Sequence, residues 1–395
     1  MKILFLSSRL PYPPIGGDRL KNYWSLKILS KHFKVHLVSL TDIDVPNGFY
    51  KFAEENKYSH KIFKKHKLLH YWNSIKGIFS KYPIQVNYYY FQDVQDYIKS
   101  VIKDFDLIIS TLIRTAHYVI DIKKPKILDM ADSIGQNYLK SAQKTKSPFW
   151  KIIYSIEKNR LLNYERLCVE KFDRILLFNK DEVNFFSNPK KVFWIPHGVE
   201  ERLLDYEKTD PHYKNCVVFF GKMDYQPNID AVLWFVERVL PKLDESLAFC
   251  VLGAYPPKFL LNMQRKYKNL KVLGFVEDPY LILKSSLCVV APMQTGGGIQ
   301  NKVLQSMALG TINIVSSLAS KPIGGENWEH YIVSDEPKSI AEIIHDILKN
   351  PSKYEKIKEE ARNFIRNNFT WSIYEREFLK HIQEVLNAHK SGISA

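Results

Sequence analysis

Short apolar runs alternate with longer segments whose apolar residues recur at helical spacing along nearly the whole chain. This alternation is typical of parallel sheets with helices on both faces, so it predicts an α/β fold. The apolar runs predict strands at Ile3–Ser7, Val35–Leu40, Asp106–Thr111, Lys126–Asp129, Arg174–Phe178, Val192–Ile195, Val217–Gly221, Ala248–Gly253, Leu270–Leu273, Leu287–Ala291, Ile312–Val315 and Tyr331–Val333. The main predicted helices are Arg19–His32, Lys151–Lys171, Ile229–Leu240, Lys258–Tyr267, Lys302–Leu309 and Lys338–Lys349.

A polar stretch, Val199–Tyr213, separates the two halves. It contains Asp210-Pro211 and has no clear period, which is typical of a linker between domains. The tail from Ser352 to His389 predicts helices that are interrupted near Asn367–Thr370. We therefore expect two α/β domains followed by a helical tail.

Length and composition fit this picture. A chain of 395 residues suggests two or three domains, and 45% hydrophobic with 25% charged residues is ordinary for a globular protein. No apolar run approaches the roughly 20 residues of a membrane-spanning helix, and the apolar start is too short for a signal peptide. We therefore expect a cytoplasmic protein. The four cysteines form no CxxC pair and are predicted to be reduced core residues.

The net charge of +15 is concentrated in the first half of the chain. Residues 1–205 hold 34 Lys and Arg against 21 Asp and Glu. Such a field suits an anionic partner: a phosphate, a nucleic acid or an anionic membrane. Because no nucleic-acid-binding motif accompanies the charge, we expect no nucleic acid partner.

One basic segment, Lys51–Pro83, is rich in Lys and His with interleaved Phe, Tyr and Trp. Its apolar residues recur at helical spacing from Leu68 to Phe79 and predict an amphipathic helix. Two interpretations fit this helix. It lies on the surface of an anionic membrane, or it packs its Leu and Trp side chains on its own sheet and exposes its lysines.

Two glycine-rich turns are candidates for anion binding. The first strand runs into PYPPIGGDRLKNYW, where Gly16 and Gly17 precede a helix that begins near Asp18. Glycine lets a backbone approach a ligand closely, and a helix N-terminus offers free N–H groups to an anion. The pair does not form the GxGxxG motif, so a plain strand-to-helix turn explains it as well.

The second turn, APMQTGGGIQNKVLQSMALG, follows the strand Leu287–Ala291. Three consecutive glycines, Gly296–Gly298, at the end of a strand favour an anion or a sugar held by main-chain amides. Lys302, in the first turn of the next helix, either adds positive charge at a phosphate or is a solvated surface lysine.

Taken in order, these motifs resemble those of the retaining family-four glycosyltransferases with the GT-B fold, in the branch that builds bacterial exopolysaccharide, capsule and lipopolysaccharide. The matching pieces span nearly the whole chain: PYPPIGGDRLKNYW, ILDMADSIGQNY, NYERLCVEKFDRILLFNKDE, IPHGVE, VVFFGKMDYQPNIDAVLWF, FCVLGAYPP, VLGFVEDPY and APMQTGGGIQNKVLQSMALG. The resemblance implies two Rossmann-like domains facing across a cleft. Residues 1–205 would bind the acceptor, residues 206–370 the nucleotide-sugar donor, and residues 371–395 would cross back to the first domain.

The resemblance also implies a donor site. Lys222 lies where the family places a basic residue on the donor diphosphate, so we expect it to be a catalytic residue. The donor-binding residues would be Gly16, Gly17, Gly274, Phe275, Val276, Gly296, Gly297, Gly298, Ile299, Gln300, Asn301, Lys302 and Gln305. The family needs no metal or other cofactor, so the nucleotide-diphosphate sugar is a substrate only.

The sequence departs from the family pattern in three ways. The two glutamates of the donor loop are replaced by Gly297 and Gln305, so a carboxylate that accepts from ribose hydroxyls is lost. A second basic residue is replaced by Pro227 in MDYQPN, where Asn228 predicts a helix cap. The usual active-site His is absent from ILDMADS, where Asp132 or Asp129 would occupy its region instead.

Asp132 has two interpretations. Its carboxylate orients an acceptor hydroxyl by accepting a hydrogen bond, or Asp132-Ser133 caps the following helix. His117, in STLIRTAHYV, is a rival for the same pocket. As a lone histidine it is also explained as a packing residue.

We therefore expect a hexosyl-type transferase that works with retention in cell-surface polysaccharide assembly. The acceptor would be a glycan or a polyprenyl-diphosphate-linked glycan at the inner face of the cell membrane, which the basic first domain suits. Two alternatives stay open. One is a catalytically degenerate, transferase-like scaffold subunit, which Gln305 and Pro227 favour. The other is a sugar-nucleotide epimerase on the same fold.

Overall fold

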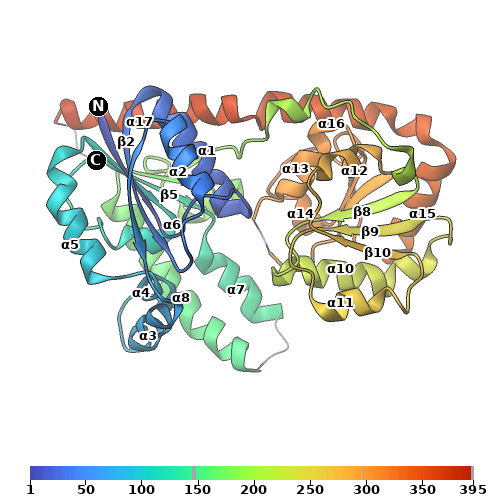
Figure 1. The fold of residues 1–395 in the computed structure, drawn as a ribbon, viewed down its shortest axis with the longest axis horizontal. Coiled ribbons are helices and arrows are strands. Elements are labelled where there is room, and N and C mark those ends of the chain that lie inside the picture. The colour runs from blue at the N-terminus through green and yellow to red at the C-terminus, as the bar shows by residue number, and fades with distance from the viewer. Residues whose placement is uncertain (145–147, 297, 393–395) are drawn as a thin grey trace. The chain divides into compact units, whose positions relative to one another are not determined.

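The computed structural model describes residues 1–144, 148–296 and 298–392, which fold into two α/β units. The first unit comprises Met1–Ile195 and the tail from Tyr374, and the second comprises Pro196–Ile373 (Figure 1). Each unit is built on its own parallel sheet, so the predicted α/β class is confirmed.

The first sheet has seven parallel strands in the order β3-β2-β1-β4-β5-β6-β7. The strands are β1 Lys2–Ser7, β2 Lys34–Thr41, β3 Ser59–Lys64, β4 Leu107–Thr111, β5 Lys126–Ala131, β6 Arg174–Leu177 and β7 Val192–Trp194. The chain moves outward from β1 to β3 and then returns to β4, so the direction of strand addition reverses between β1 and β4. The carboxyl ends at such a reversal are where open α/β sheets bind ligands.

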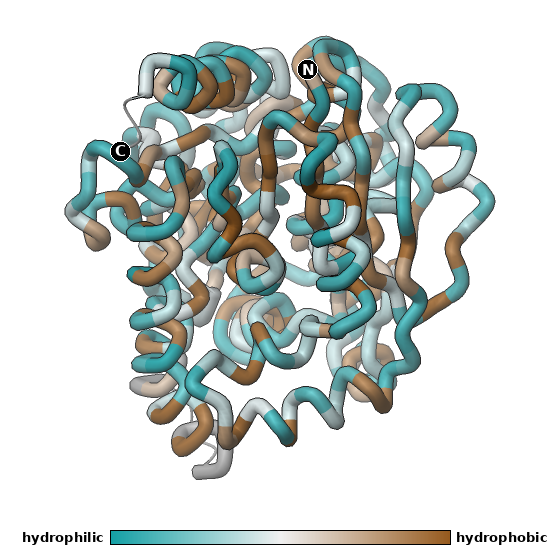
Figure 2. The backbone as a smooth tube through the Cα atoms, turned by 90° about the vertical axis from the view of Figure 1, so that its left-hand side faces the viewer, coloured by the Kyte–Doolittle hydropathy of each residue, from teal (hydrophilic) through white to brown (hydrophobic). Residues whose placement is uncertain are grey.

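Nine α-helices connect the strands within the described part of the first unit. They are α1 Gly17–His32, α2 Asn47–Glu55, α3 Lys67–Ile78, α4 Ile84–Tyr88, α5 Gln92–Val101, α6 Leu112–Ala116, α7 Ile134–Lys144, α8 Pro148–Lys171 and α9 Lys180–Phe186. Strands β1 and β4 are buried along almost their whole length, because helices cover both faces of the sheet. Figure 2 shows this apolar core as brown stretches of the tube below the N-terminus.

The second sheet has six parallel strands in the order β10-β9-β8-β11-β12-β13, with the reversal between β8 and β11. The strands are β8 Cys216–Phe220, β9 Ala248–Leu252, β10 Leu270–Gly274, β11 Cys288–Ala291, β12 Asn313–Val315 and β13 Ile332–Val333. The helices are α10 Gln226–Arg238, α11 Lys258–Met263, α12 Pro279–Ser285, α13 Asn301–Ala308, α14 Ser317–Ser320, α15 Pro337–Lys349 and α16 Glu355–Asn368. All four cysteines are buried and unpaired, as predicted.

The last helix, α17 Trp371–Lys390, belongs to the first unit from Tyr374 onward. The buried Tyr374 hydroxyl lies 2.9 Å from Ser25 Oγ of α1, and Glu375 pairs with Lys31 at 2.8 Å. Farther along, Glu384 pairs with Arg174 of β6 at 2.6 Å. The predicted return of the tail to the first domain is therefore confirmed, as is the helix break near Asn367–Thr370.

All twelve predicted strands form, but the edge strand β3 was not predicted. Its sequence, SHKIFK, contains no apolar run because a strand at the sheet edge has little side-chain surface to bury. No helix in the described part of the chain is long and apolar enough to cross a membrane.

Candidate functional site

The carboxyl ends of β8 and β9 approach each other closely in the second unit. The amide of Gly221 donates to Leu252 O at 2.9 Å, and Gly253 has a φ of +152°. A Cβ added to Gly253 would lie 1.8 Å from the carbonyl oxygen of Gly221. Only glycine fits there, so this contact fixes the turn that presents the next residue, Lys222.

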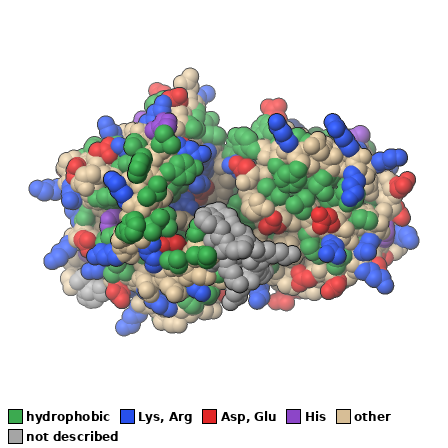
Figure 3. Space-filling view, turned by 90° about the horizontal axis from the view of Figure 1, so that it is seen from below, with side chains coloured by type: hydrophobic (Ala, Val, Ile, Leu, Met, Phe, Trp, Pro, Cys, Tyr) green, Lys and Arg blue, Asp and Glu red, His purple; other side chains and the backbone are tan. Residues whose placement is uncertain are grey.

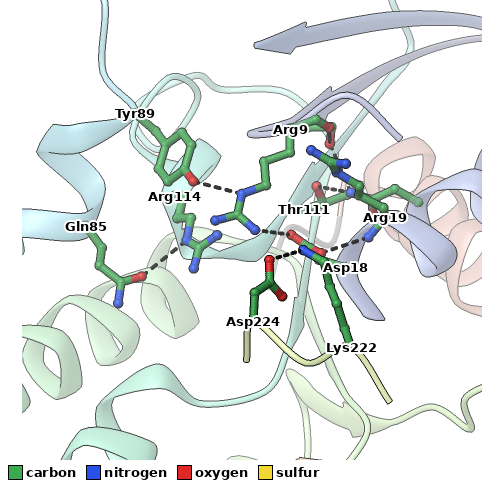
Figure 4. Close-up of polar contacts among 11 residues, drawn as sticks. Arg9, Asp18, Arg19, Gln85, Tyr89, Thr111, Arg114, Lys222 and Asp224 are labelled. Carbon is green, nitrogen blue, oxygen red and sulfur yellow. Dashed lines mark hydrogen bonds and ion pairs between the residues drawn. The ribbon is translucent and has the colours of Figure 1, made fainter. Parts of the chain in front are cut away.

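Lys222 projects from this turn with a partly exposed side chain. Its Nζ lies 2.9 Å from Asp224 Oδ2 (Figure 4). The same atom lies 5.2 Å from the centroid of the Tyr255 ring. Tyr255 has a φ of +61°, a backbone conformation that is strained for a residue other than glycine and that is enriched at functional sites. The accessible ammonium group of Lys222 suits an anionic ligand at the carboxyl end of β8.

Lys302 lies at the carboxyl end of β11, on the other side of the strand-order reversal. Its side chain is only 8% exposed, so the interpretation of a solvated surface lysine is wrong. Its Nζ donates to Asn228 Oδ1 and to Gln300 Oε1, both at 2.9 Å, and lies over the Phe219 ring. Burial lowers the pKa of Lys302 to about 7. Among the described residues, no carboxylate forms an ion pair with this ammonium group.

Asn228 connects the two lysines and is not a helix cap. Helix α10 begins at Gln226, one turn earlier than the predicted cap requires, with Pro227 in its first turn. Asn228 is buried, and its Nδ2 donates to the carbonyl oxygen of Lys222 at 2.8 Å while its Oδ1 accepts from Lys302. The prediction of an Asn228 cap is therefore wrong. Both ends of its side-chain amide instead form hydrogen bonds to the two lysines.

The glycine loop before α13 packs against the start of α10. Gly296 has a φ of +85°, and an added Cβ would lie 3.2 Å from Pro227 Cβ. Gln300 Nε2 donates back to Gly298 O at 2.8 Å and so holds the end of the loop. Gly297 lies outside the described residues. Pro227, which replaces a basic residue of the family, thus supports the loop by packing.

The remaining predicted donor-binding residues border the same sheet edge. Gly274 ends β10 with a φ of +69°, and its carbonyl oxygen accepts from Gly253 N at 2.8 Å. Phe275 follows with 71% of its side chain exposed. Gln305 Nε2 lies 3.3 Å from the Tyr280 hydroxyl. The other members of the set, Val276, Ile299 and Asn301, are half-buried, and Asn301 Oδ1 is a buried atom without a hydrogen-bond partner.

In the first unit, Asp132 follows the carboxyl end of β5 through a strained turn. Ala131 has a φ of +64°, and Asp132 N donates to Met130 O at 2.8 Å. The buried Oδ1 of Asp132 has no hydrogen-bond partner. Burial raises the pKa of Asp132 to about 6, against the opposing charges of Lys21 and Lys140. This carboxyl group is therefore a hydrogen-bond acceptor that its own unit leaves unused.

Ser133, and not Asp132, caps helix α7. Ser133 Oγ accepts from Gln136 N at 3.1 Å and donates to Glu165 at 2.7 Å, while Ser133 N donates to Glu182 at 2.7 Å. Both glutamates are fully buried, and burial raises the pKa of Glu165 to about 7 and that of Glu182 to about 9. These contacts hold the turn that carries Asp132.

Sequence reasoning missed the buried charges behind Asp132. Lys21 of α1 is 3% exposed and pairs with Asp129 of β5, and burial lowers the pKa of Lys21 to about 7. The available signal was that Lys21 and Glu165 occupy the same helix faces as apolar residues, a position in which charged side chains need partners. The cluster is assembled from α1, β5, α8 and α9.

His117 has a different environment. Its ring packs between the rings of Tyr82 and Tyr90, with centroids 4.3 and 4.9 Å away, and burial lowers its pKa. It ends the short helix α6, whereas Asp132 faces buried ionic groups at the end of β5. Both residues carry a buried polar atom, His117 Nδ1 and Asp132 Oδ1, that has no hydrogen-bond partner among the described residues.

The Gly16–Gly17 turn begins α1 as predicted. Gly16 has a φ of +101°, and its carbonyl oxygen accepts from Leu20 N at 2.9 Å. Both glycines are exposed, so their amides are open to a ligand.

Helix α3 exposes most of its apolar side chains. Only His70 and Gly77 are buried, whereas Trp72 is 61% and Phe79, just after the helix, is 90% exposed. The interpretation that this helix packs its Leu and Trp residues on its own sheet is therefore wrong. Figure 3, which views the end of the first unit that carries α3 and α8, shows hydrophobic side chains among Lys and Arg.

Part of the second half of the chain is similar to a known protein family. Residues 214–350 match the family model described as "Glycosyl transferases group 1". The matched range contains Lys222, the glycine loop and Lys302.

Two curated relatives extend over more of the chain. An uncharacterized 44.6 kDa protein in the cps region of Klebsiella pneumoniae is 22% identical, covering 93% of this chain and 96% of that protein. An uncharacterized glycosyltransferase of Methanocaldococcus jannaschii is also 22% identical, covering 72% of this chain and 76% of that protein.

Solved structures of glycosyltransferases share the fold at low sequence identity. HepE of Anabaena, in complex with UDP-glucose, is 14% identical with a TM-score of 0.69, covering 97% of this chain and all of that one. WaaG, a glycosyltransferase involved in lipopolysaccharide biosynthesis, is 14% identical with a TM-score of 0.67, covering 95% and 98%. The predicted GT-B fold with two Rossmann-like sheets is therefore confirmed.

Proposed function

We propose that the protein is a retaining, hexosyl-type glycosyltransferase that uses a nucleotide-diphosphate sugar. The observation that carries this proposal is Lys302, a buried ammonium group near the strand-order reversal of the second sheet that donates to two neutral oxygens and pairs with no carboxylate among the described residues. A buried cation of this kind is unfavourable without an anion, so a diphosphate beside it would stabilise the charged form.

In this proposal the two lysines act on the leaving group. Lys222 is accessible and Lys302 is buried, and both follow strands that flank the same reversal. As the bond from the sugar to the diphosphate breaks, negative charge grows on the diphosphate oxygens, and these preplaced ammonium groups stabilise it. The backbone amides of Gly296 and Gly298 would contribute to the same site.

Asp132 is proposed to act on the acceptor. Its Oδ1, which has no hydrogen-bond partner among the described residues, would accept a hydrogen bond from the acceptor hydroxyl and orient that hydroxyl. Its pKa, raised to about 6, makes this carboxylate a stronger base than an ordinary aspartate. Glu165 and Glu182 would hold the turn in place without touching the substrate.

The acceptor is proposed to be a glycan or a lipid-linked glycan of the cell surface. Support comes from the relative in a cps region and from the fold shared with WaaG. UDP-glucose is the first donor to test, because HepE binds it on the same fold.

We also propose that α3 rests on an anionic membrane, at the cytoplasmic face. Its exposed apolar set is Leu68, Leu69, Tyr71, Trp72, Ile75, Ile78 and Phe79, and exposed lysines Lys67, Lys76 and Lys81 accompany it. Arg160 of α8 anchors the end of α3 by donating to Gly77 O at 2.8 Å and Tyr82 O at 2.6 Å. A rigid apolar face with basic neighbours has the chemistry of an interfacial helix.

The experiment that tests the transferase is a thermal-shift panel of UDP-, GDP-, ADP-, dTDP- and CMP-sugars without added metal. We expect one nucleotide to raise the melting temperature of the wild type and not that of Lys222→Ala or Lys302→Met. Transfer of labelled sugar from that donor to extracted lipid-linked glycan would then establish the activity. Donor binding without transfer would support the scaffold alternative, and a changed nucleotide sugar formed from donor alone would support the epimerase.

A further inference from the structure

Two arginines stand at the strand-order reversal of the first sheet. Arg9 follows β1, and Arg114 lies on α6 directly after β4. Leu112 turns the chain from β4 into α6 with a φ of +58°, a strained conformation for leucine. The carboxyl ends of β1 and β4 thus each supply one guanidinium group at the place where an α/β sheet binds ligands.

Tyr89 holds both guanidinium groups. Arg9 Nε donates to the Tyr89 hydroxyl at 2.9 Å, and Arg114 Cζ lies 5.2 Å from the centroid of the same ring (Figure 4). Tyr89 is itself 7% exposed, so it is a fixed support. Arg114 Nε donates to Gln85 Oε1 at 3.2 Å, and Gln85 Nε2 donates in turn to the Tyr138 hydroxyl at 2.7 Å. Both arginines are therefore preorganised through their Nε atoms by neutral groups.

The charges of this cluster do not balance. Arg9 pairs with Asp18 at 3.3 Å, and Asp18 Oδ1 is also used by the backbone amide of Arg19. In the part of the chain that the structure describes, no carboxylate forms an ion pair with Arg114. The Arg9 side chain is still 47% exposed, which leaves it open to a ligand.

We propose that Arg9 and Arg114 bind a phosphoryl group of the acceptor. Two fixed guanidinium groups suit a phosphoryl dianion better than a single carboxylate, because each presents paired N–H donors and the combined charge is matched. The phosphoryl group would come either from the diphosphate of a lipid-linked acceptor or from a phosphorylated sugar. Assigning it to an acceptor rests on the transferase function proposed above, whereas the anion site itself rests on the arginines alone.

The test is calorimetric titration of the full chain presaturated with UDP, so that the proposed donor diphosphate site is filled. The probes are dimethylallyl diphosphate for the lipid-linked source, galactose 1-phosphate for the phosphorylated sugar, and glucuronate for a carboxylate. Arg9→Gln and Arg114→Gln are compared with Arg166→Gln, which removes an exposed arginine of α8 in the same unit.

We expect the wild type and Arg166→Gln to bind one of the two phosphoryl probes and to bind glucuronate more weakly. Each of Arg9→Gln and Arg114→Gln should weaken phosphoryl binding ~10-fold, as the loss of one charge-assisted hydrogen bond implies. UDP binding should be unchanged in both. Equal phosphoryl affinity in all four proteins, or preference for glucuronate, would overturn the proposal.

The two proposals fail differently. If the wild type binds UDP but neither phosphoryl probe, the arginine site is wrong and the donor site stands. If it binds a probe through Arg9 and Arg114 but no nucleotide, the arginine site stands and the transferase proposal fails. Probe binding that is lost in Lys222→Ala but kept in both arginine variants would place the probe at the donor site and overturn the inference.

Discussion

The ammonium group of Lys302 donates a hydrogen bond to Asn228 Oδ1 at 2.9 Å. The same Asn228 side chain donates to the carbonyl oxygen of Lys222 at 2.8 Å. One buried amide therefore sets the positions of both lysines that flank the strand-order reversal of the second sheet. The amide is neutral, so it holds Lys302 without balancing the charge of its ammonium group, whereas Lys222 pairs with Asp224 at the exposed side of the site.

Nucleotide binding should be coupled to proton uptake by Lys302. Its pKa is lowered to about 7, so at pH 8 most of the free protein carries a neutral amine there. A diphosphate beside it favours the ammonium form and raises the pKa, so binding takes up a proton and UDP affinity falls as the pH rises above 7, by up to ~10-fold per pH unit. Titration calorimetry at pH 8 in buffers of different ionisation enthalpy measures this proton directly.

The Lys302→Met variant should bind UDP more weakly, and its binding of UDP should not take up that proton. Lys338→Met is the matched control, because Lys338 has an 85% exposed side chain on α15. It should behave as the wild type. The same proton count in Lys302→Met and the wild type would show that another group takes up the proton.

The close approach of β8 and β9 predicts a severe effect of Gly253→Ala. The new methyl group would lie 1.8 Å from Gly221 O at a φ of +152°, so either the turn shifts or the backbone clashes. We expect the free energy of unfolding to fall by ~3 kcal/mol, with donor binding weakened because Lys222 follows that turn. Urea unfolding followed by circular dichroism measures the change.

Gly324→Ala separates the clash from backbone strain. Gly324 also has a positive φ, +71°, but no atom lies within 4 Å of its added Cβ. In Gly324→Ala the free energy of unfolding should fall by only about 1 kcal/mol, from the strain of a positive φ at alanine. Equal losses in the two variants would contradict the role assigned to the contact between Gly253 and Gly221.

The strand pattern was predictable because central strands of parallel sheets are buried on both faces. Apolar runs such as Leu287–Ala291 therefore predict β11 and the neighbouring strands directly. The edge strand β3 carries no such run and was missed. The glycine loop before α13 was predictable too, since its strand and helix are adjacent in sequence.

The ionic groups around the sites were not predictable in the same way. Lys21, Asp129 and Glu182 come from three separate elements, and no local spacing signals that they meet. The pairing of Arg9 and Arg114 through Tyr89 likewise depends on the order of strands. The sequence also left open whether Lys302 is a solvated surface lysine, because the burial of a side chain depends on how the whole unit packs.

The stability of the first unit should depend on the ionisation of Glu182. Its folded-state pKa is raised to about 9, above the ordinary value near 4.5, so the folded protein holds a proton that the unfolded chain releases. The contribution of Glu182 therefore favours folding at low pH and is lost progressively as the pH rises from about 4.5 to 9. Glu182→Gln keeps an acceptor for Ser133 N and removes the ionisation.

Glu182→Gln should thus have a flatter profile of melting temperature against pH, with a higher melting temperature than the wild type at pH 8 and a similar one at pH 4.5. Differential scanning calorimetry from pH 4.5 to 9 measures both. Glu54→Gln, at an exposed position on α2, should follow the wild-type profile. Parallel profiles for Glu182→Gln and the wild type would show that Glu182 is ionised in the folded state.

Membrane binding should depend on the exposed aromatic residues of α3 and its end. Trp72 and Phe79 are 61% and 90% exposed, and each would bury most of that surface in the interface of a bilayer. Replacing both with Ser should weaken partitioning onto vesicles that contain anionic lipid by ~10-fold or more, from the loss of transfer free energy. Cosedimentation with phosphatidylglycerol–phosphatidylcholine vesicles measures this, with vesicles of pure phosphatidylcholine as the comparison without net charge.

Trp328→Ser, which removes a 50% exposed aromatic residue of the second unit, should bind as the wild type does. Equal binding of Trp72→Ser/Phe79→Ser and the wild type would exclude α3 as the membrane contact, because these two side chains are the most exposed large aromatic residues of that segment.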